Sequence, residues 1–178
     1  MNRHRRTTLP GENRIVAVTI FAAATACGLG LSTVRRPTVD RFPRVEVLER
    51  RIDAIAQAIA LAEGYYASGD HDGRSLPYVL NNPGALKKPP HGSTPLPTWR
   101  DTGLICFPTR DRGWAALRHQ VRAMLTGTSD IYLPSDSLTR VATKYADGNL
   151  AWGSNVAATL GVPTVTTLAE LASGNVTR

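Results

Sequence analysis

A regular apolar stripe between residues 46 and 66 constrains the fold of this chain more than any other feature. On a helical wheel drawn at about 100° per residue, the members of the stripe fall within an arc of about 120°. They are Leu48, Ile52, Ile55, Ala56, Ile59 and Ala62. This spacing predicts an amphipathic helix from about Glu46 to Tyr66, with one face buried against a core.

Glu63 lies within the same arc, one turn beyond Ile59 and close to the predicted end of the helix. Burial and the negative end of the helix dipole both disfavour an ionised carboxylate, so we expect the pKa of Glu63 to be raised. A carboxylic acid that keeps its proton near neutral pH is suited to cleaving glycosidic bonds, because it can protonate the leaving oxygen. The alternative interpretation is that the helix frays before Glu63, whose side chain then reaches water or pairs with an arginine.

An uncharged run, residues 15–31, follows a basic stretch and indicates a secretory signal or an N-terminal anchor within residues 1–34. Three interpretations stay open. The run spans a membrane if residues 32–34 are added to it, or it is a cleaved signal with Ala24-Thr25-Ala26 as the cleavage site, or it resembles a lipoprotein signal that ends at Cys27. All three predict that the rest of the chain is exported to the periplasm or cell envelope, and they leave membrane association open.

The net charge of +7 is concentrated at the N-terminus. Residues 1–44 hold eight arginines and two acidic residues, whereas residues 45–178 hold thirteen basic and twelve acidic residues. Because the predicted domain is almost neutral, the sequence argues against a nucleic-acid partner. Cys106 is the only cysteine after the leader, so there is no internal disulfide framework, and the histidines show no metal-ligand spacing.

We divide the chain into the leader (1–34), a polar linker (35–44) and a domain (45–178). Within the domain, residues 67–108 are rich in Gly, Pro, Asn and Ser, and the segments "ALKKP" and "LICFPT" are expected to form two short strands. Four more helices follow from capping signals. Thr109 can start the first of them, which Gly127 ends, and Asp136 or Ser137 can cap the second. Asn149 can cap the third, which Gly161 ends, and the capping box Thr167 to Glu170 starts the fourth. The predicted fold class is a mainly α domain with a long irregular segment and a small β-hairpin.

Four segments occur in a familiar order: "AIALAEGYY", "LNNPGALKKP", "FPTRDRGWAAL" and "KYADGNLAWGSNVAATLGV". Together they resemble the lysozyme-like superfamily, in particular the branch related to lytic transglycosylases whose members carry an aEG-type helix end followed by an NNPG loop. The resemblance covers roughly residues 50–171. It implies an α+β lysozyme-like fold and an enzyme, a glycosidase or lytic transglycosylase, that cleaves peptidoglycan.

The resemblance also implies roles for individual residues. Glu63 corresponds to the catalytic acid, and Tyr145 to a tyrosine that reaches towards that acid. The loop that helps to line the saccharide groove corresponds to Asn81, Asn82, Pro83 and Gly84. Of the two tyrosines beside the acid, one is expected to pack inside and the other, Tyr66, to bind sugar. Familiar transglycosylases have Ser where this chain has Gly64, and G-L-M-Q where it has "NNPGAL", which leaves the outcome of the reaction open.

Each assignment has a purely structural alternative. "NNPG" is a strong turn signal in its own right, and aromatic residues at helical positions usually belong to the core. We assign Tyr145 to the site because of its motif, and Trp114 and Trp152 to the core. No spacing identifies a second carboxylate among the loop acids Asp70, Asp72, Asp101 and Asp147.

The sequence therefore predicts an exported, monomeric enzyme that acts on the bond between N-acetylmuramic acid and N-acetylglucosamine. Its partners would be peptidoglycan glycan strands, and no cofactor or metal is implied. One alternative is a non-catalytic glycan-binding or virion or envelope structural module on the same fold. A second alternative is an envelope-anchored interaction protein whose helices carry no groove.

Overall fold

The computed structural model describes residues 42–89 and 95–176, all of which belong to one unit, Val39–Arg178. The predicted leader lies outside these residues. In the described ranges, no helix is long and apolar enough to cross a membrane. The first helix begins at Phe42, so the last residues of the segment predicted as linker are helical.

The described chain is mainly helical with a small two-stranded antiparallel sheet, which confirms the predicted class at that level. The elements are α1 (Phe42–Ala62), α2 (Leu76–Val79), β1 (Thr98–Trp99), the 3-10 helix η1 (Arg100–Thr102), β2 (Leu104–Ile105), α3 (Arg110–Thr126), α4 (Leu138–Tyr145), α5 (Leu150–Leu160) and α6 (Leu168–Ser173).

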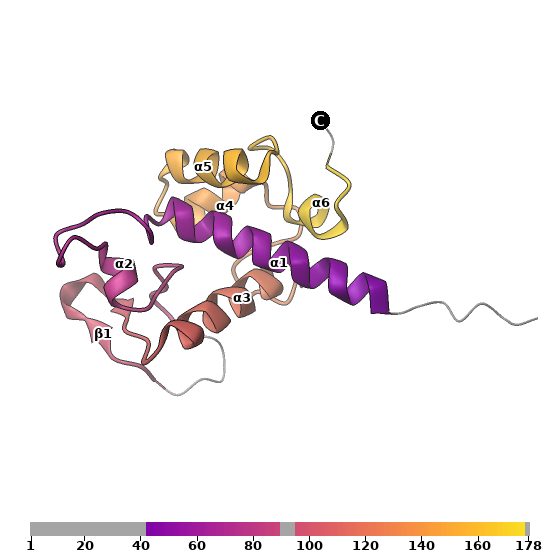
Figure 1. The fold of residues 1–178 in the computed structure, drawn as a ribbon. Helices are drawn as coiled ribbons and strands as arrows, with labels where there is room; N and C mark the ends of the chain where they lie inside the picture. The colour runs from indigo at the N-terminus through magenta and orange to yellow at the C-terminus, as the bar shows by residue number, and fades with distance from the viewer. Residues whose placement is uncertain (1–41, 90–94, 177–178) are drawn as a thin grey trace, which may run out of the picture. The chain divides into compact units, whose positions relative to one another are not determined.

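Helix α1 forms the centre of the fold. It contacts α3, α5 and α6, and α4 packs on α5; in Figure 1, α4 and α5 lie on one side of α1 and α3 lies on the other. The predicted apolar stripe faces this core. Ile52, Ile55, Ala56 and Ile59 are all buried, while Leu48 and Ala62 are partly buried against the same cluster. The burial of this face stabilises the helix because apolar surface is removed from water.

Helix α1 ends four residues earlier than its hydrophobic pattern predicts. Gly64 adopts a left-handed conformation with φ 69°. Its N–H donates to the Leu61 carbonyl at 3.0 Å, and the Tyr65 N–H donates to the Ala60 carbonyl at 2.9 Å. These two bonds form a Schellman motif, in which glycine tolerates the positive φ that other residues resist. Glu63 is therefore the residue that caps the C-terminus of α1.

The boundaries of α3 and α5 and the starts of α4 and α6 were predicted correctly because each depends on a local capping residue. The short helix α2, which is capped by Ser75, lies in the segment predicted as irregular and was not predicted. Thr109, Ser137 and Asn149 accept hydrogen bonds from the first turns of α3, α4 and α5. Helix α6 has the expected capping box, in which the Thr167 side chain and the Glu170 side chain bond to each other's backbone N–H groups. Gly127 and Gly161 end α3 and α5 in left-handed conformations.

The prediction for the strands was only partly correct. The "ALKKP" segment is not a strand, and only Leu104 and Ile105 of "LICFPT" belong to one, which pairs with Thr98 and Trp99. The Ile105 N–H does donate to the Leu86 carbonyl at 2.9 Å. However, the Leu86 N–H donates to the Asn82 side chain at 2.8 Å. The segments around Leu86 and Ile105 therefore share one backbone hydrogen bond and do not form a pair of strands.

Gly113 lets the loop of residues 81–84 lie directly against α3. A Cβ at this position would lie 1.7 Å from the Asn81 carbonyl oxygen and 3.0 Å from the Pro83 ring. Only a residue without a side chain permits this approach. Helix α2, the β1–β2 hairpin and the loop lie together near the N-terminal end of α3 (Figure 1).

We expect Gly113→Ala to destabilise the protein by about 2–3 kcal/mol, because the new methyl group would force the loop away from α3. Urea unfolding would measure this change. His119→Ala, at an exposed position of the same helix, is the control and should change stability by less than about 0.5 kcal/mol. A stabilised Gly113→Ala variant, the usual result of removing glycine from a helix, would contradict the close approach.

Candidate functional site

Glu63 is held between the end of α1 and the start of α5. Its side chain is half-buried, and its Oε1 accepts a hydrogen bond of 2.7 Å from the indole Nε1 of Trp152. The Schellman turn fixes the backbone of Glu63, and the Asn149 cap places Trp152 in the first turn of α5. Two local signals, far apart in the sequence, thus bring the two side chains together.

The pKa of Glu63 is raised above its ordinary value. The largest cause is burial, which disfavours the charged carboxylate. The hydrogen bond from Trp152 and the positive charge of Lys87 act in the opposite direction and lower the pKa. The net direction is the one expected from the position of Glu63 on the helical wheel. Glu63 is therefore a carboxyl group that holds its proton more firmly than a solvated glutamic acid.

Tyr145, the last residue of α4, connects this carboxyl group to the NNPG loop. Its ring stacks on Trp152 with 4.9 Å between the centroids and 22° between the planes. Its hydroxyl donates to the Gly84 carbonyl at 2.6 Å. Burial raises the pKa of Tyr145 well above its ordinary value, and the charge of Glu63 adds to this effect. The hydroxyl was expected to reach towards the acid. It makes its hydrogen bond to the loop, but it is near enough to Glu63 for that charge to act on it, and the Tyr145 ring stacks on Trp152, whose N–H bonds to Glu63.

The side chain of Asn82 is a structural group and does not face a saccharide groove. It is 0 % exposed. Its Nδ2 donates to the carbonyls of Leu86 and Ile105 at 2.9 and 3.0 Å, and its Oδ1 accepts from the Leu86 N–H at 2.8 Å. Because both ends of the amide are used inside the protein, the expectation that it binds sugar is corrected. Its role is to join the loop to β2.

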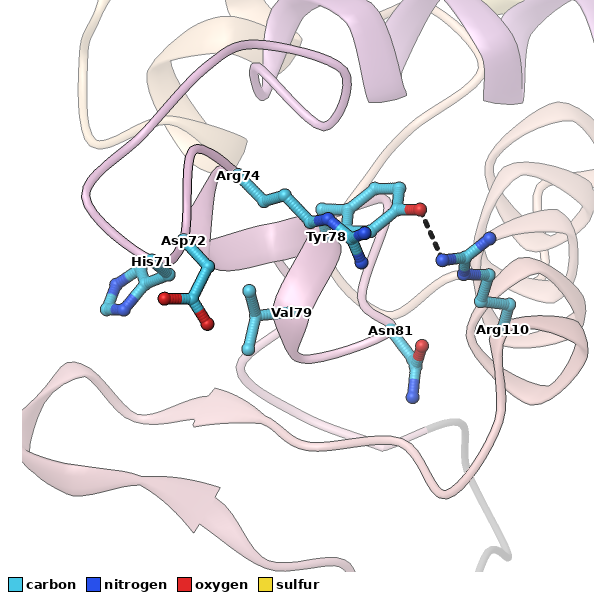
Figure 2. Close-up of a pocket in the computed structure, with 7 residues that line it drawn as sticks. All are labelled: His71, Asp72, Arg74, Tyr78, Val79, Asn81 and Arg110. Atoms are coloured by element: carbon cyan, nitrogen blue, oxygen red, sulfur yellow. Dashed lines mark hydrogen bonds between the residues drawn. The ribbon is translucent and has the colours of Figure 1, made fainter.

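Pro83 and Gly84 are also buried, so the expectation that these two residues line a saccharide groove is wrong. A Cβ on Gly84 would lie 2.7 Å from Leu117 Cδ1 and 2.9 Å from the Tyr145 hydroxyl. Asn81 differs: it is half-buried with φ 54°, and its Nδ2 donates to the Phe107 carbonyl at 3.0 Å. Asn81 also lines a pocket on the outer side of the loop (Figure 2).

The two tyrosines after Glu63 divide as predicted into one packed and one accessible ring. Tyr65 is buried among aromatic side chains, with Tyr66, Tyr78 and Trp114 each within 5.7 Å between centroids. Tyr66 is 56 % exposed, and its hydroxyl donates to Gln57 at 3.3 Å. Tyr66 thus keeps an open face close in sequence to Glu63.

Trp152 is the site residue that sequence reasoning missed. It was assigned to the core, where it does lie, with 4 % of its surface exposed. Its indole N–H nevertheless bonds to Glu63, which is 89 residues away in the chain. The one usable signal was chemical, since a buried tryptophan usually finds an acceptor for its N–H. Trp114 lies against Tyr65 and is half-buried.

Three of the four loop acids, Asp70, Asp72 and Asp147, are not buried, and the side chain of Asp101 lies outside the described part of the structure. Asp70 and Asp72 are exposed. Asp147 has a side chain that is 85 % exposed, and it pairs with Lys87 at 3.3 Å. In the described part of the chain, no three His, Cys, Asp or Glu residues lie together in a way that could hold a metal ion.

Comparisons with protein-family models, curated proteins and solved structures returned no match to this chain.

We expect Trp152→Phe to raise the pKa of Glu63 further, because it removes a hydrogen bond that stabilises the carboxylate. A pH titration of the Glu63 side-chain carboxyl carbon by NMR would measure the pKa. Trp114→Phe is the matched control and should leave this titration unchanged. A Glu63 pKa that stays the same or falls in Trp152→Phe would show that the indole N–H does not stabilise the charged form.

Glu63→Gln should be more stable than the unmodified protein at pH 7 and lose that advantage in acid. The pKa of Glu63 is raised in the folded protein. The Glu63 side chain therefore stabilises the folded state fully below its unfolded pKa of about 4.3, and this stabilisation is lost as the pH rises through its folded pKa. Glutamine stays neutral and can still accept from Trp152. Urea unfolding between pH 3 and 8 would measure the difference, with Glu46→Gln on the same helix as the control for loss of a negative charge. An advantage that is greatest in acid would contradict the raised pKa.

Proposed function

We propose that residues 45–178 form a lysozyme-like domain that cleaves the bond between N-acetylmuramic acid and N-acetylglucosamine in peptidoglycan, with Glu63 as the single general acid and base. One observation carries the proposal: a half-buried carboxyl group at the end of α1, with a raised pKa, is held by Trp152. It is connected through Tyr145 to the NNPG loop. The order of the sequence segments supports the same proposal.

In the proposed reaction, the protonated Glu63 donates its proton to the leaving glycosidic oxygen while the sugar develops oxocarbenium character. Burial keeps this proton in place at a pH where a solvated carboxyl would have lost it. The Trp152 N–H, which bonds to Oε1, stabilises the carboxylate that forms. Glu63 then accepts a proton from the attacking hydroxyl, which is the 6-hydroxyl of the muramic acid or water.

The surroundings of Glu63 favour transglycosylation over hydrolysis. Two-carboxylate glycosidases need a second acid at the reacting carbon. Asp147, the loop acid two residues after Tyr145, is exposed and paired with Lys87. The buried acid Asp136 is paired with Lys144. With Glu63 as the single catalytic acid, the acetamide or hydroxyl of the substrate supplies the second half of the reaction, and the product carries an anhydro end.

In this proposal, the substrate is contacted by side chains that are accessible at the surface, Tyr66 and Asn81. Tyr66 presents an exposed ring, and Asn81 lies at the surface of a loop that Asn82 and Gly84 hold from inside. The substrate lies outside the cytoplasm, which agrees with the export predicted from residues 1–34.

Purified protein incubated with cell-wall sacculi should release soluble glycan fragments, and Glu63→Gln should slow this release by at least about 100-fold, because a general acid contributes that much to the rate. Binding to sacculi should survive. Glu46→Gln, exposed on the same helix, should cleave normally. Mass spectrometry of the fragments would identify anhydro ends, for transglycosylation, or hydrated ends, for hydrolysis.

The same experiment separates the alternatives. If the unmodified protein binds sacculi but releases no fragments, the domain is a glycan-binding module without catalysis. If it neither binds nor cleaves, the envelope interaction protein is the better interpretation. If Glu63→Gln cleaves at the normal rate, Glu63 is not the acid.

A further inference from the structure

A pocket with a volume of about 370 Å³ is lined partly by Asn81 of the NNPG loop, and neither Glu63 nor Trp152 is among its lining residues. Its walls come from three segments: the turn of residues 71–74, helix α2 with Asn81, and the first residue of α3, Arg110. Figure 2 shows these side chains around one hollow, with two arginines and a histidine among them. A pocket of this volume is within the range of small-ligand sites.

The sequence "HDGR" builds one wall of this pocket. His71 and Arg74 exchange two backbone hydrogen bonds, of 3.3 and 3.0 Å, as an antiparallel pair. Between them, Asp72 and Gly73 have φ values of 51° and 76°. An Asp-Gly pair with two positive φ values is the favoured two-residue hairpin turn. The turn holds the backbones of His71 and Arg74 side by side, and their side chains point in different directions, His71 towards Trp99 and Arg74 towards Tyr78 (Figure 2).

The two arginines are oriented by Tyr78 on α2. The guanidinium carbon of Arg74 lies 5.1 Å from the centre of the Tyr78 ring, and that of Arg110 lies 4.4 Å from it. Arg110 also donates a hydrogen bond to the Tyr78 hydroxyl (Figure 2). An arginine that stacks on an aromatic ring keeps the N–H groups at its edge available for planar acceptors. Tyr78 thus holds the guanidinium groups of both arginines beside one pocket.

Neither arginine is neutralised by a salt bridge within the described residues. This distinguishes them from Arg118 and Arg122 on α3, which pair with the carboxylates of Asp53 and Glu49 on α1. Asp72 also lines the pocket, but the two guanidinium groups leave the pocket with a net positive charge. The polar groups therefore select an anion, while Val79 and the Tyr78 ring supply an apolar surface beside it.

We propose that this pocket binds the carboxylate of an amino-acid-sized or short peptide ligand through Arg74 and Arg110. Guanidinium groups bind carboxylates with two parallel hydrogen bonds. The apolar surface formed by Val79 and Tyr78 suits an aliphatic group attached to that carboxylate better than it suits a free inorganic anion. This binding needs no chemistry at Glu63, so it is independent of the proposed cleavage.

The test is an NMR titration of the full-length protein with N-acetyl-alanyl-alanine, following the backbone amides of residues 71–81. We expect saturable shifts with the free C-terminal carboxylate and none with the C-terminal amide of the same dipeptide. Arg74→Gln and Arg110→Gln should each weaken binding about tenfold, because each removes charged hydrogen bonds. Arg112→Gln, exposed on the same helix and outside the pocket lining, is the matched control and should bind normally.

A second measurement needs no variant. Raising the sodium chloride concentration from about 0.05 to 0.5 M should weaken binding to the unmodified protein, because salt screens exposed charges. Glu63→Gln should bind the dipeptide normally, so a failure of the cleavage proposal leaves this one intact. Equal binding of the amide, normal binding by both pocket variants, or tighter binding of inorganic phosphate would each overturn the carboxylate assignment.

Discussion

The left-handed turn at Gly64 is the constraint on which the candidate site depends. It stops α1 while the apolar face of the helix is still in contact with the core, so Glu63 stays close to that core. It also puts Glu63 at the C-terminal end of the helix, where the partial negative charge of the helix dipole disfavours ionisation. If the helix had continued, Tyr65 could not have turned back to bond to Ala60 and pack inside.

The environment of Glu63 is a balance of two opposing effects. Burial raises the pKa of the carboxyl group, whereas the N–H of Trp152 and the charge of Lys87 lower it. Burial alone would raise the pKa of Glu63 further, and the hydrogen bond and the charge alone would lower it. Folded proteins keep such arrangements mainly where they serve chemistry, because an unfavourably ionised group reduces stability at neutral pH.

The sequence predicted many of the features that depend on neighbouring residues, although it missed α2 with its Ser75 cap and placed the end of α1 four residues too late. It failed on the features that depend on distant residues. Thr109, Ser137 and Asn149 were found as helix caps because a cap bonds within its own first turn. The burial of Asn82 depends on Ile105, 23 residues away. "NNPG" read as exposed polar amides because no local pattern reveals that partner. Local periodicity also cannot show that a core tryptophan directs its N–H at a carboxylate on another helix.

The NNPG loop is linked both to Glu63 and to the proposed pocket. On its inner side, the Gly84 carbonyl accepts from Tyr145, whose ring stacks on the tryptophan that holds Glu63. On its outer side, Asn81 lines the pocket that also contains Arg110. Because the loop is anchored to β2 and pressed against Gly113, it is a rigid connection. A displacement of Gly84 would therefore move the support of the carboxyl group and the wall of the pocket together, whereas a change confined to the arginines would alter the pocket alone.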